Sequence, residues 1–436
     1  MRFTSLAAWL AWQETLHPKS IDLGLARVAE VYARLAAAAP GGPARTVISV
    51  GGTNGKGSCV AMLASILRAG GYRVGTYTSP HLLRYNERVR IGDEPAGDAG
   101  LCEAFARIDA ARGDISLSYF EFGTLAALDL FARADLDVAV LEVGMGGRLD
   151  AVNVVDADAA LVASVDLDHM DWLGADREAI AYEKAGIFRA GRPAVFGEAD
   201  VPRSLMAHAD AVGAELRCLG LDYRYTPDAG GWTWESGGEG DAPRRRSALP
   251  APSLRGAHQL QNAAAVVTVL DALRERLPLS QADIRTGLTT VRLPGRFECL
   301  PATEDDVIEV WDVAHNPAAA GALAAALRAQ GRRPTHAVVG MLGDKDIGAT
   351  LAPLVSLVDT WHLGALGGER GADAQALTRA LEALHPGVDA SCYGDVVAAH
   401  RGARAAVPPG GRVVVFGSFY TVAAVAESVS GAVVGA

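Results

Sequence analysis

A glycine-rich segment near the N-terminus constrains the fold of this chain more than any other feature. Residues 52–58 read GTNGKGS; they follow the apolar run 46–50 and precede the stretch 60–67, where apolar residues recur at helical spacing. Strand, glycine turn and helix in this order predict half of a βαβ unit. Glycines let backbone N–H groups approach phosphate oxygens, Lys56 adds a mobile cation, and the Ser58 hydroxyl can reach a metal ion. A nucleotide site is favoured over a plain glycine-rich turn.

Length and the pattern of apolar runs predict two α/β domains. At roughly 100–200 residues per domain, 436 residues suit two domains. Apolar runs without alternation are typical of parallel strands covered on both faces. The alternation of strands and helices restarts near residue 295, so we expect a mostly parallel sheet within 1–295 and a smaller α/β domain at 296–436. The segment 220–250, rich in Gly, Trp, Arg and Pro, predicts a β-excursion or a long loop.

Charge, hydropathy and cysteine content exclude several classes of protein. The formal net charge is −11, and the one basic run, 244–246, lies among Gly, Pro and Ser, so we expect no nucleic-acid partner. No uninterrupted apolar stretch approaches the ~20 residues of a membrane span, so we expect no membrane partner. Five cysteines without CxxC spacing favour a reducing compartment over disulfides or zinc. We therefore expect a cytoplasmic monomer acting on small molecules.

Further motifs follow the glycine-rich loop in a fixed order along the chain. They are Ser79-Pro80-His81-Leu82, Phe120-Glu121-Phe122-Gly123-Thr124, EVGMGGRLDAVN at 142–153, Asp168-His169, Glu183-Lys184-Ala185-Gly186-Ile187, Pro294-Gly295-Arg296-Phe297 and Asp312-Val313-Ala314-His315-Asn316-Pro317. The loop itself departs from GxxxxGK[ST], with Val50 in place of the first glycine and Gly57 inserted after Lys56. In this ordered set, nearly the whole chain resembles the bifunctional dihydrofolate synthase/folylpolyglutamate synthase family, the folate branch of the Mur ligase superfamily.

The resemblance implies both a fold and an activity. The fold is a Mur-ligase-like P-loop domain that binds ATP and a pterin, followed by a Rossmann-like domain that contributes to glutamate and nucleotide binding. The activity is that of an ADP-forming, Mg²⁺-requiring ligase that adds L-glutamate to dihydropteroate and to reduced folates. A carboxylate is a poor acylating group, so the γ-phosphoryl group of ATP would first convert it into an acyl phosphate, which the glutamate amine attacks.

Three residues are candidate metal ligands. Glu142 ends an apolar strand, where an unpaired carboxylate would be costly, so it either binds a cation or forms a structural ion pair. His169 also follows an apolar run, and the resemblance implies that it and Ser79 bind the metal ion. Mg²⁺ prefers oxygen ligands, which makes a histidine less usual. The resemblance further implies that Lys184 is carbamylated; an unmodified lysine contacting phosphate or Glu183 is the alternative.

Roles for the remaining candidate residues come from the resemblance. It implies ATP contacts from Gly52, Thr53, Asn54, Gly55, Lys56, Gly57, Ser58, Asn262, Arg296 and Asp312. It implies pterin contacts from Asp22, Leu23, Gly24, Leu25, Ser118, Phe120, Asp150, Ala151 and Asn153. Lys56, Lys184 and His315 are the expected catalytic residues. Simpler structural roles stay open: Phe120 in the core, Arg296 in a solvent-facing linker, Asp312 as a turn former, and His315 as a capping or turn residue. Asn316-Pro317 predicts a helix start, with Asn at the N-cap and Pro at the first helical position.

Two other functions compete with the folate ligase. A peptidoglycan amino-acid ligase of the same superfamily is disfavoured by the pterin-site pattern and by the SPHL segment at 79–82. A non-catalytic nucleotide switch would hydrolyse ATP slowly, without response to pteroate or glutamate. ADP release that requires both substrates distinguishes the ligase from the switch.

Overall fold

The structure, a computed structural model, describes residues 2–19, 21–38, 41–237, 243–302, 306–368 and 370–434. The chain divides into two compact units, each with its own core. The N-terminal unit comprises the described residues up to His81, together with Tyr85–Ser253 and Leu260–Val291. The C-terminal unit comprises the described residues from Arg292 onward and two short segments, Leu82–Arg84 and Leu254–Gln259.

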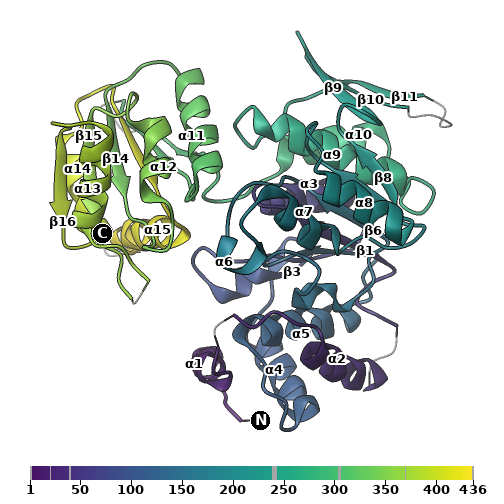
Figure 1. Ribbon diagram of the computed structural model, residues 1–436. Coiled ribbons are helices and arrows are strands. Elements are labelled where there is room, and N and C mark those ends of the chain that lie inside the picture. The colour runs from purple at the N-terminus through teal and green to yellow at the C-terminus, as the bar shows by residue number, and fades with distance from the viewer. Residues whose placement is uncertain are drawn as a thin grey trace. The chain divides into compact units, whose positions relative to one another are not determined.

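An eight-stranded, mostly parallel sheet forms the centre of the N-terminal unit (Figure 1). Its strands are β1 Thr46–Gly51, β2 Val74–Tyr77, β3 Val89–Ile91, β4 Glu94–Pro95, β5 Val138–Glu142, β6 Ala159–Val162, β7 Pro193–Phe196 and β8 Glu215–Cys218. They lie in the order β4-β3-β2-β5-β1-β6-β7-β8; among the described strands, β2 with β3 and β3 with β4 pair antiparallel and the other neighbours pair parallel. Every residue of β1, β2, β5 and β6 is buried, which explains why these strands read as apolar runs without alternation.

Helices cover this sheet and carry the longer connections. They are α1 Leu6–Leu16, α2 Ala26–Ala38, α3 Lys56–Ala69, α4 Asp98–Arg112, α5 Tyr119–Ala132, α6 Met170–Leu173, α7 Arg177–Ala185, α8 Arg203–Val212, α9 His258–Ala272 and α10 Gln281–Thr290, with short 3₁₀ turns at Tyr85–Arg88 and Ala151–Val154. Helices α1 and α2 pack on α4 and α5. The contact between α1 and α4 includes Trp9 and Phe105, both fully buried, with ring centroids 5.9 Å apart. Fully burying one such side chain contributes roughly 2–3 kcal/mol.

The segment expected to be a β-excursion or a loop forms a small antiparallel sheet. Its strands are β9 Tyr223–Asp228, β10 Gly231–Ser236 and β11 Arg244–Leu249, in the order β11-β10-β9, and residues 238–242 lie outside the described part. Trp232 and Trp234 are fully buried, and Trp234 Nε1 donates to Thr268 Oγ1 of α9 at 2.9 Å. Trp234 therefore attaches this sheet to α9.

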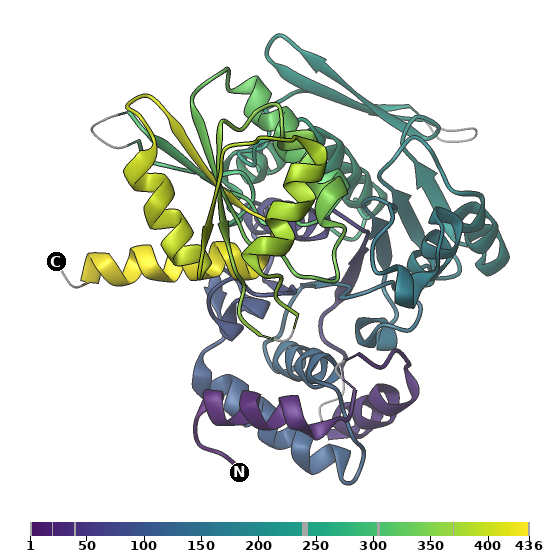
Figure 2. The same cartoon turned by 60° about the vertical axis from the view of Figure 1, so that its left-hand side comes forward.

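The C-terminal unit is a second α/β layer structure with helices on both faces of its sheet (Figures 1 and 2). Its strands are β12 Glu298–Leu300, β13 Ile308–Trp311, β14 Thr335–Val339, β15 Thr360–Gly364, β16 Ala390–Tyr393 and β17 Arg412–Phe416. Its helices are α11 Pro317–Ala329, α12 Ile347–Leu351, α13 Ala374–Leu384, α14 Val396–Ala406 and α15 Phe419–Val434, with a 3₁₀ turn at Ala352–Leu354. The order is β12-β13-β17-β14-β15-β16, and only β12 pairs antiparallel. The expected two-part α/β architecture is confirmed.

No helix in the described ranges combines the length and the apolar character that crossing a bilayer requires.

The packing of α10 against α3 generates a stability prediction. A Cβ added to Gly287 of α10 would lie 2.4 Å from Ile66 Cα of α3, so Gly287→Ala should force the helices apart. We expect a loss of about 1–3 kcal/mol, the usual cost of overpacking. Gly100→Ala in α4 is the matched control, because its Cβ would meet only Leu130 Cδ2 at 3.8 Å. Thermal unfolding of both variants measures the difference; equal midpoints would contradict the close helix contact.

Candidate active site

The carboxyl ends of four neighbouring parallel strands bring the candidate phosphate and metal residues to one edge of the sheet. The strands lie in the order β2-β5-β1-β6. Ser79 follows β2, Glu142 ends β5, the loop 52–58 follows β1, and residues 164–169 follow β6. Because the carboxyl edge of an open α/β sheet is where such folds bind ligands, this edge is the candidate active site.

Two glycines give the phosphate loop its shape. Gly55 is the N-cap of α3 and has φ 83°, in the left-handed region that favours glycine. A Cβ there would lie 2.9 Å from Asn262 Oδ1, which places Asn262 of α9 against the loop. Gly52 has φ 142°, and its Cβ would lie 3.1 Å from Ser164 N. Side chains at these positions would therefore push the loop away from α9 and from the segment that follows β6. The loop leads into the N-terminus of α3, where backbone N–H groups can receive an anion.

Ser164, which follows β6, anchors the phosphate loop. Thr53 N donates to Ser164 O at 2.8 Å, and Asn54 N donates to Ser164 Oγ at 2.9 Å. The Ser164 hydroxyl donates in turn to Asn54 O at 3.0 Å. Ser164 was not among the predicted site residues, although a small polar residue just past a strand, at the same edge as the loop, was a usable signal. The loop is preorganised by this pairing.

Lys56 and Ser58 occupy the first turn of α3. Lys56 Nζ donates to Gly52 O at 2.9 Å and to Thr53 O at 3.2 Å, so its ammonium group lies over the loop. Ser58 is buried. A cation at this position is suited to compensate the charge of a triphosphate bound along the loop.

Glu142 and Ser79 lie in direct contact at the edge of the sheet. Glu142 is buried, and its Oε2 accepts the Ser79 backbone N–H at 3.2 Å. His169 begins α6 with φ 52°, and its half-buried ring has Nε2 4.0 Å from Asp168 Oδ1. Among the described residues, no three His, Cys, Asp or Glu side chains form a metal cage. The Glu142 carboxylate and the Ser79 hydroxyl are oxygen ligands of the kind that Mg²⁺ prefers, and water and phosphate oxygens can supply others. The His169 imidazole is the less usual ligand of the three.

Lys184 is a buried amine close to these charges. It lies in α7 with 3% of its surface exposed. Burial, with repulsion from Lys56, lowers the pKa of Lys184 to about 7, although Asp168 and Asp150 act in the opposite direction. Glu183 Oε1 is instead paired with Arg148 Nη2 at 2.8 Å. A lysine with this pKa becomes mainly neutral as the pH rises above about 7, and the neutral amine is the form that reacts with CO₂.

The three candidate pterin segments converge within the N-terminal unit. Gly24 N donates to Leu149 O at 3.1 Å, which joins the loop 22–25 to the segment 149–153. The half-buried Phe120 lies against the backbone of Gly144, where a Cβ would come within 2.5 Å of its Cζ. Its ring centroid is 6.0 Å from that of Tyr77. Phe120 therefore packs against the core and is also partly exposed, so both of its predicted roles are compatible with the structure.

Asp150 and Asn153 shape the loop on which they lie. Asp150 is buried and accepts Met145 N at 2.9 Å and Val152 N at 3.0 Å. Burial outweighs these hydrogen bonds and raises the pKa of Asp150 to about 6. Asn153 Nδ2 donates to two backbone carbonyls, those of Arg148 and Gly186. Ala151, between them, is buried, so this segment presents a firmly held backbone.

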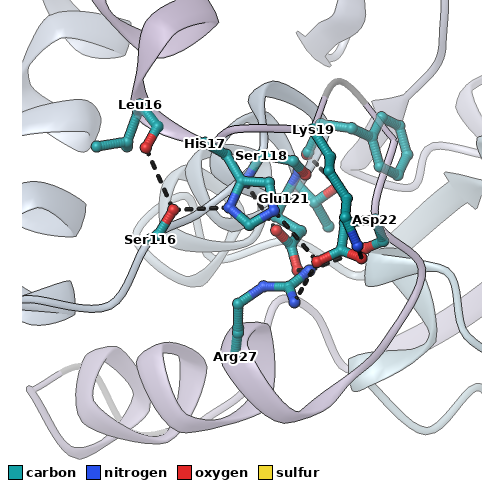
Figure 3. A network of polar contacts seen from close by, with 10 residues as sticks. Leu16, His17, Lys19, Asp22, Arg27, Ser116, Ser118 and Glu121 are labelled. Carbon is teal, nitrogen blue, oxygen red and sulfur yellow. Dashed lines mark hydrogen bonds and ion pairs between the residues drawn. The ribbon is translucent and has the colours of Figure 1, made fainter.

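Sequence reasoning assigned no role to the polar network that joins Asp22 to Ser118 (Figure 3). Arg27 contacts Asp22 and Glu121, and Glu121 completes a capping box with Ser118 at the start of α5. Desolvation opposes ionisation of Asp22, but Arg27, His17 and Lys19 together keep its pKa below the usual value. The spacing Ser118-x-x-Glu121 is a helix-start signature, so the capping half of this network was detectable in the sequence.

The candidates of the C-terminal unit surround one turn, after β13. Asp312 Oδ2 accepts Phe297 N and its Oδ1 accepts Ala314 N, both at 2.8 Å, as a turn former would. Burial raises the pKa of Asp312, although Arg296 and these N–H groups act to lower it. The Arg296 guanidinium lies 4.9 Å from the centroid of Phe419. His315 Nδ1 lies 2.9 Å from Val313 O.

The cap of α11 is supplied by the neighbour of His315. Asn316 Oδ1 accepts Ala319 N at 2.9 Å, and Pro317 is the first helical residue, which confirms the predicted helix start. His315 therefore precedes the cap, and its ring centroid is 6.2 Å from that of Phe419.

Comparisons with known proteins agree with this architecture. The model of the Mur ligase middle domain matches residues 50–270, and that of the Mur ligase glutamate ligase domain matches residues 295–419. Dihydrofolate synthase/folylpolyglutamate synthase of Escherichia coli strain K12 is 46% identical, over 97% of this chain and 95% of its own. The structure of E. coli FolC in complex with DHPP and ADP has a TM-score of 0.90 at 44% identity, covering 98% of both chains.

A further solved structure is a bifunctional folylpolyglutamate synthase/dihydrofolate synthase with Mn, AMPPNP and L-glutamate bound. It has a TM-score of 0.88 at 46% identity and covers 98% of both chains. The expected Mur-ligase-like fold and ATP-dependent ligase activity are confirmed, and the folate ligase is supported over the peptidoglycan ligase. The chain belongs to the dihydrofolate synthase/folylpolyglutamate synthase family of Mur ligases.

Proposed function

We propose that this enzyme adds L-glutamate to dihydropteroate and to reduced folates, with ATP and the pterin acid bound at the carboxyl edge of the N-terminal sheet. The observation that carries the proposal is the convergence of the phosphate loop, the Glu142–Ser79 pair and buried Lys184 at that edge. Glycine at positions 52 and 55 keeps the loop close against Ser164 and Asn262, and the loop leads into the N-terminus of α3, whose backbone N–H groups can bind an anion. Each group has a distinct task in making an acyl phosphate.

The main task of the N-terminal unit would be to bind ATP and to transfer its γ-phosphoryl group to the acceptor carboxylate. In this proposal residues 52–58 hold the triphosphate, and Asn262, in contact with the loop, binds the adenine end. Lys56 would move from the loop carbonyls onto the γ-phosphoryl oxygens and stabilise the charge spread over them during transfer. Holding the acceptor carboxylate and phosphate in line would supply much of the rate, on the order of 7–11 kcal/mol for well-oriented groups.

Ser79, Glu142 and His169 would hold Mg²⁺. The metal ion supplies Lewis-acid neutralisation of phosphate charge. As a carbamate, Lys184 would carry a negative charge and would attract Lys56 and the metal ion, whereas its ammonium form repels Lys56. The contact from Ser79 N to Glu142 orients the carboxylate before the ion binds.

The remaining candidate residues would bind the pterin acceptor, the nucleotide and the incoming glutamate. Asp22–Leu25, Ser118, Phe120 and the segment 150–153 would enclose the pterin, with the exposed part of Phe120 stacking on its rings. From the predicted C-terminal domain, 296–436, we assign Arg296 and Asp312 to the nucleotide and His315 to the incoming glutamate. The five cysteines are unpaired, which suits a cytoplasmic enzyme. We propose that it acts there as a monomer on small molecules, without nucleic-acid or membrane partners.

An ADP-release assay tests the function directly. Purified enzyme with ATP and Mg²⁺ should release ADP only when L-glutamate and an acceptor are both present, with dihydropteroate and tetrahydrofolate compared as acceptors. Omitting either substrate should reduce the rate to background, because the amine captures the acyl phosphate. ADP release indifferent to both substrates would instead support a nucleotide switch.

Lys56→Ala should abolish ligation while leaving the fold intact. Removing the cation that faces the transferred phosphoryl group should lower kcat by at least about a hundred-fold, as for other groups that stabilise transition-state charge. Arg68→Ala is the control, since Arg68 lies at the other end of α3 and pairs with Asp93 on the surface. Steady-state ADP release and far-UV circular dichroism measure the two effects. Near-normal turnover of Lys56→Ala would refute the phosphate role.

Lys184 should carry one carbamate that depends on pH. In buffer with ¹³C-bicarbonate, ¹³C NMR should show a single carbamate signal that is absent from Lys184→Ala and retained in Lys19→Ala. Because the pKa of Lys184 is lowered to about 7, the signal should grow as the pH rises above that value and fade below it.

The same shift predicts a stability trend in CO₂-free buffer. The unfolded chain binds the extra proton between the folded pKa of about 7 and the unfolded value of 10.5. With the lysine unmodified, the free energy of unfolding should therefore rise with pH across that window.

For the carbamate experiment, full activity without any carbamate signal would exclude the modification from the mechanism.

A further inference from the structure

Arg27 joins two segments that are distant in sequence. It lies in the first turn of α2, and its Nη1 is 2.7 Å from Asp22 Oδ2. Its Nη2 donates to Asp22 O at 2.9 Å and to Glu121 Oε1 at 3.0 Å. One guanidinium therefore contacts the loop 22–25 and the start of α5 at the same time (Figure 3).

Glu121 transmits this contact to Ser118. Its side chain is 4% exposed, and its Oε2 accepts the Ser118 backbone N–H at 2.8 Å. The Ser118 hydroxyl in turn accepts Glu121 N at 3.3 Å, completing the capping box. A buried carboxylate needs a cation or several donors, and here the helix start and Arg27 provide both. Arg27 is thus linked through one residue to the N-cap of the helix that carries Phe120.

Asp22 is held from its other side by the segment that follows α1. His17 Nε2 lies 3.1 Å from Asp22 Oδ2, while His17 Nδ1 lies 2.6 Å from Ser116 Oγ. Lys19 Nζ adds a more distant contact at 3.4 Å, and its side chain is 67% exposed. These contacts fix Asp22 relative to residue 116, but none of them reaches Glu121. Among the contacts drawn in Figure 3, the link between Asp22 and Glu121 runs through Arg27.

The geometry suits a guanidinium better than an ammonium. Arginine presents several N–H donors in a rigid planar fork, whereas lysine is a point charge on a flexible stem. The fork lets one side chain bind a carboxylate and a carbonyl of one segment and a carboxylate of another. The Arg27 side chain therefore spans the gap between the two segments.

We propose that Arg27 is a positioning residue that holds the loop 22–25 in register with the start of α5 and thereby sets the affinity for the pterin acceptor. This inference rests on the proposed function, which places both segments around the pterin. Without Arg27 the two segments would have to be ordered when the acceptor binds, and that cost would appear in acceptor affinity. Nucleotide binding at the phosphate loop uses neither segment.

The test compares Arg27→Ala and Arg27→Lys with Arg34→Ala in the full-length enzyme. Arg34 is the matched control because it lies on the same helix and also combines a carboxylate partner, Glu30, with backbone carbonyls, those of Ala111 and Arg112. The measurements are kcat and KM for dihydropteroate, tetrahydrofolate, ATP and glutamate, together with the thermal unfolding midpoint. Arg27→Ala should raise both acceptor KM values about ten-fold, as expected for losing one orienting interaction. The KM values for ATP and glutamate should stay unchanged.

Arg27→Lys separates positioning from simple stabilisation. It keeps a positive charge beside Glu121, so the unfolding midpoint should return close to that of the unmodified enzyme, while the acceptor KM stays raised. Recovery of both quantities together, or acceptor KM values matching those of Arg34→Ala, would overturn the inference. An unmodified enzyme without acceptor-dependent ADP release would overturn the proposed function, and this role with it. An active enzyme with an unaffected Arg27→Ala variant would overturn the inference alone.

Discussion

Parallel hydrogen bonding between β2, β5, β1 and β6 is the constraint on which the candidate active site depends. In the registers of these strands, Val50 pairs with Glu142 and Gly51 pairs with Val162. The pairing of Tyr77 with Leu141 brings Ser79 level with the end of β5. Three loops and one carboxylate are therefore placed at one edge by backbone geometry alone, before any side-chain interaction acts. A parallel sheet buried on both faces tolerates no slip of register, because a one-residue shift would reverse which side chains face each helix layer.

Several charged side chains lie at the carboxyl edge of the N-terminal sheet, where burial disfavours their charged forms. Lys56 and Lys184 repel one another, and burial of Lys184 lowers its pKa to about 7. Burial raises the pKa of Asp150 to about 6, so an acid and a base both titrate close to neutrality in the same region. Perturbed groups of this kind cluster at functional sites, because charge buried there is available to interact with ligand charge. The folded chain therefore holds charged groups at this edge at a cost in burial and repulsion, and bound triphosphate, a metal ion and a carbamate would reduce that cost.

Local patterns were sufficient to predict the phosphate loop, the buried strands and the start of α11 at Asn316. Each depends on residues within a few positions of one another, where propensity and capping act directly. The contact between Arg27 and Glu121 spans 94 residues, and nothing in the local spacing of either residue indicates the other. Ser164, which holds the loop from 110 residues away, was missed for the same reason. Trp232 and Trp234 of β10 are both buried, but Thr268, the hydrogen-bond partner of Trp234, lies beyond the segment 220–250.

Leu82 shows that the two units are not consecutive pieces of chain. It follows the candidate metal ligand Ser79 by three positions, yet its side chain packs with Val313 and Val422 in a core cluster of the C-terminal unit. Leu254–Gln259 likewise belongs to that unit. Recombining this enzyme with a relative at a single junction near residue 295 would therefore leave one parent's Leu82 in the other parent's core. A chimera that preserves both interiors has to exchange three separate stretches together.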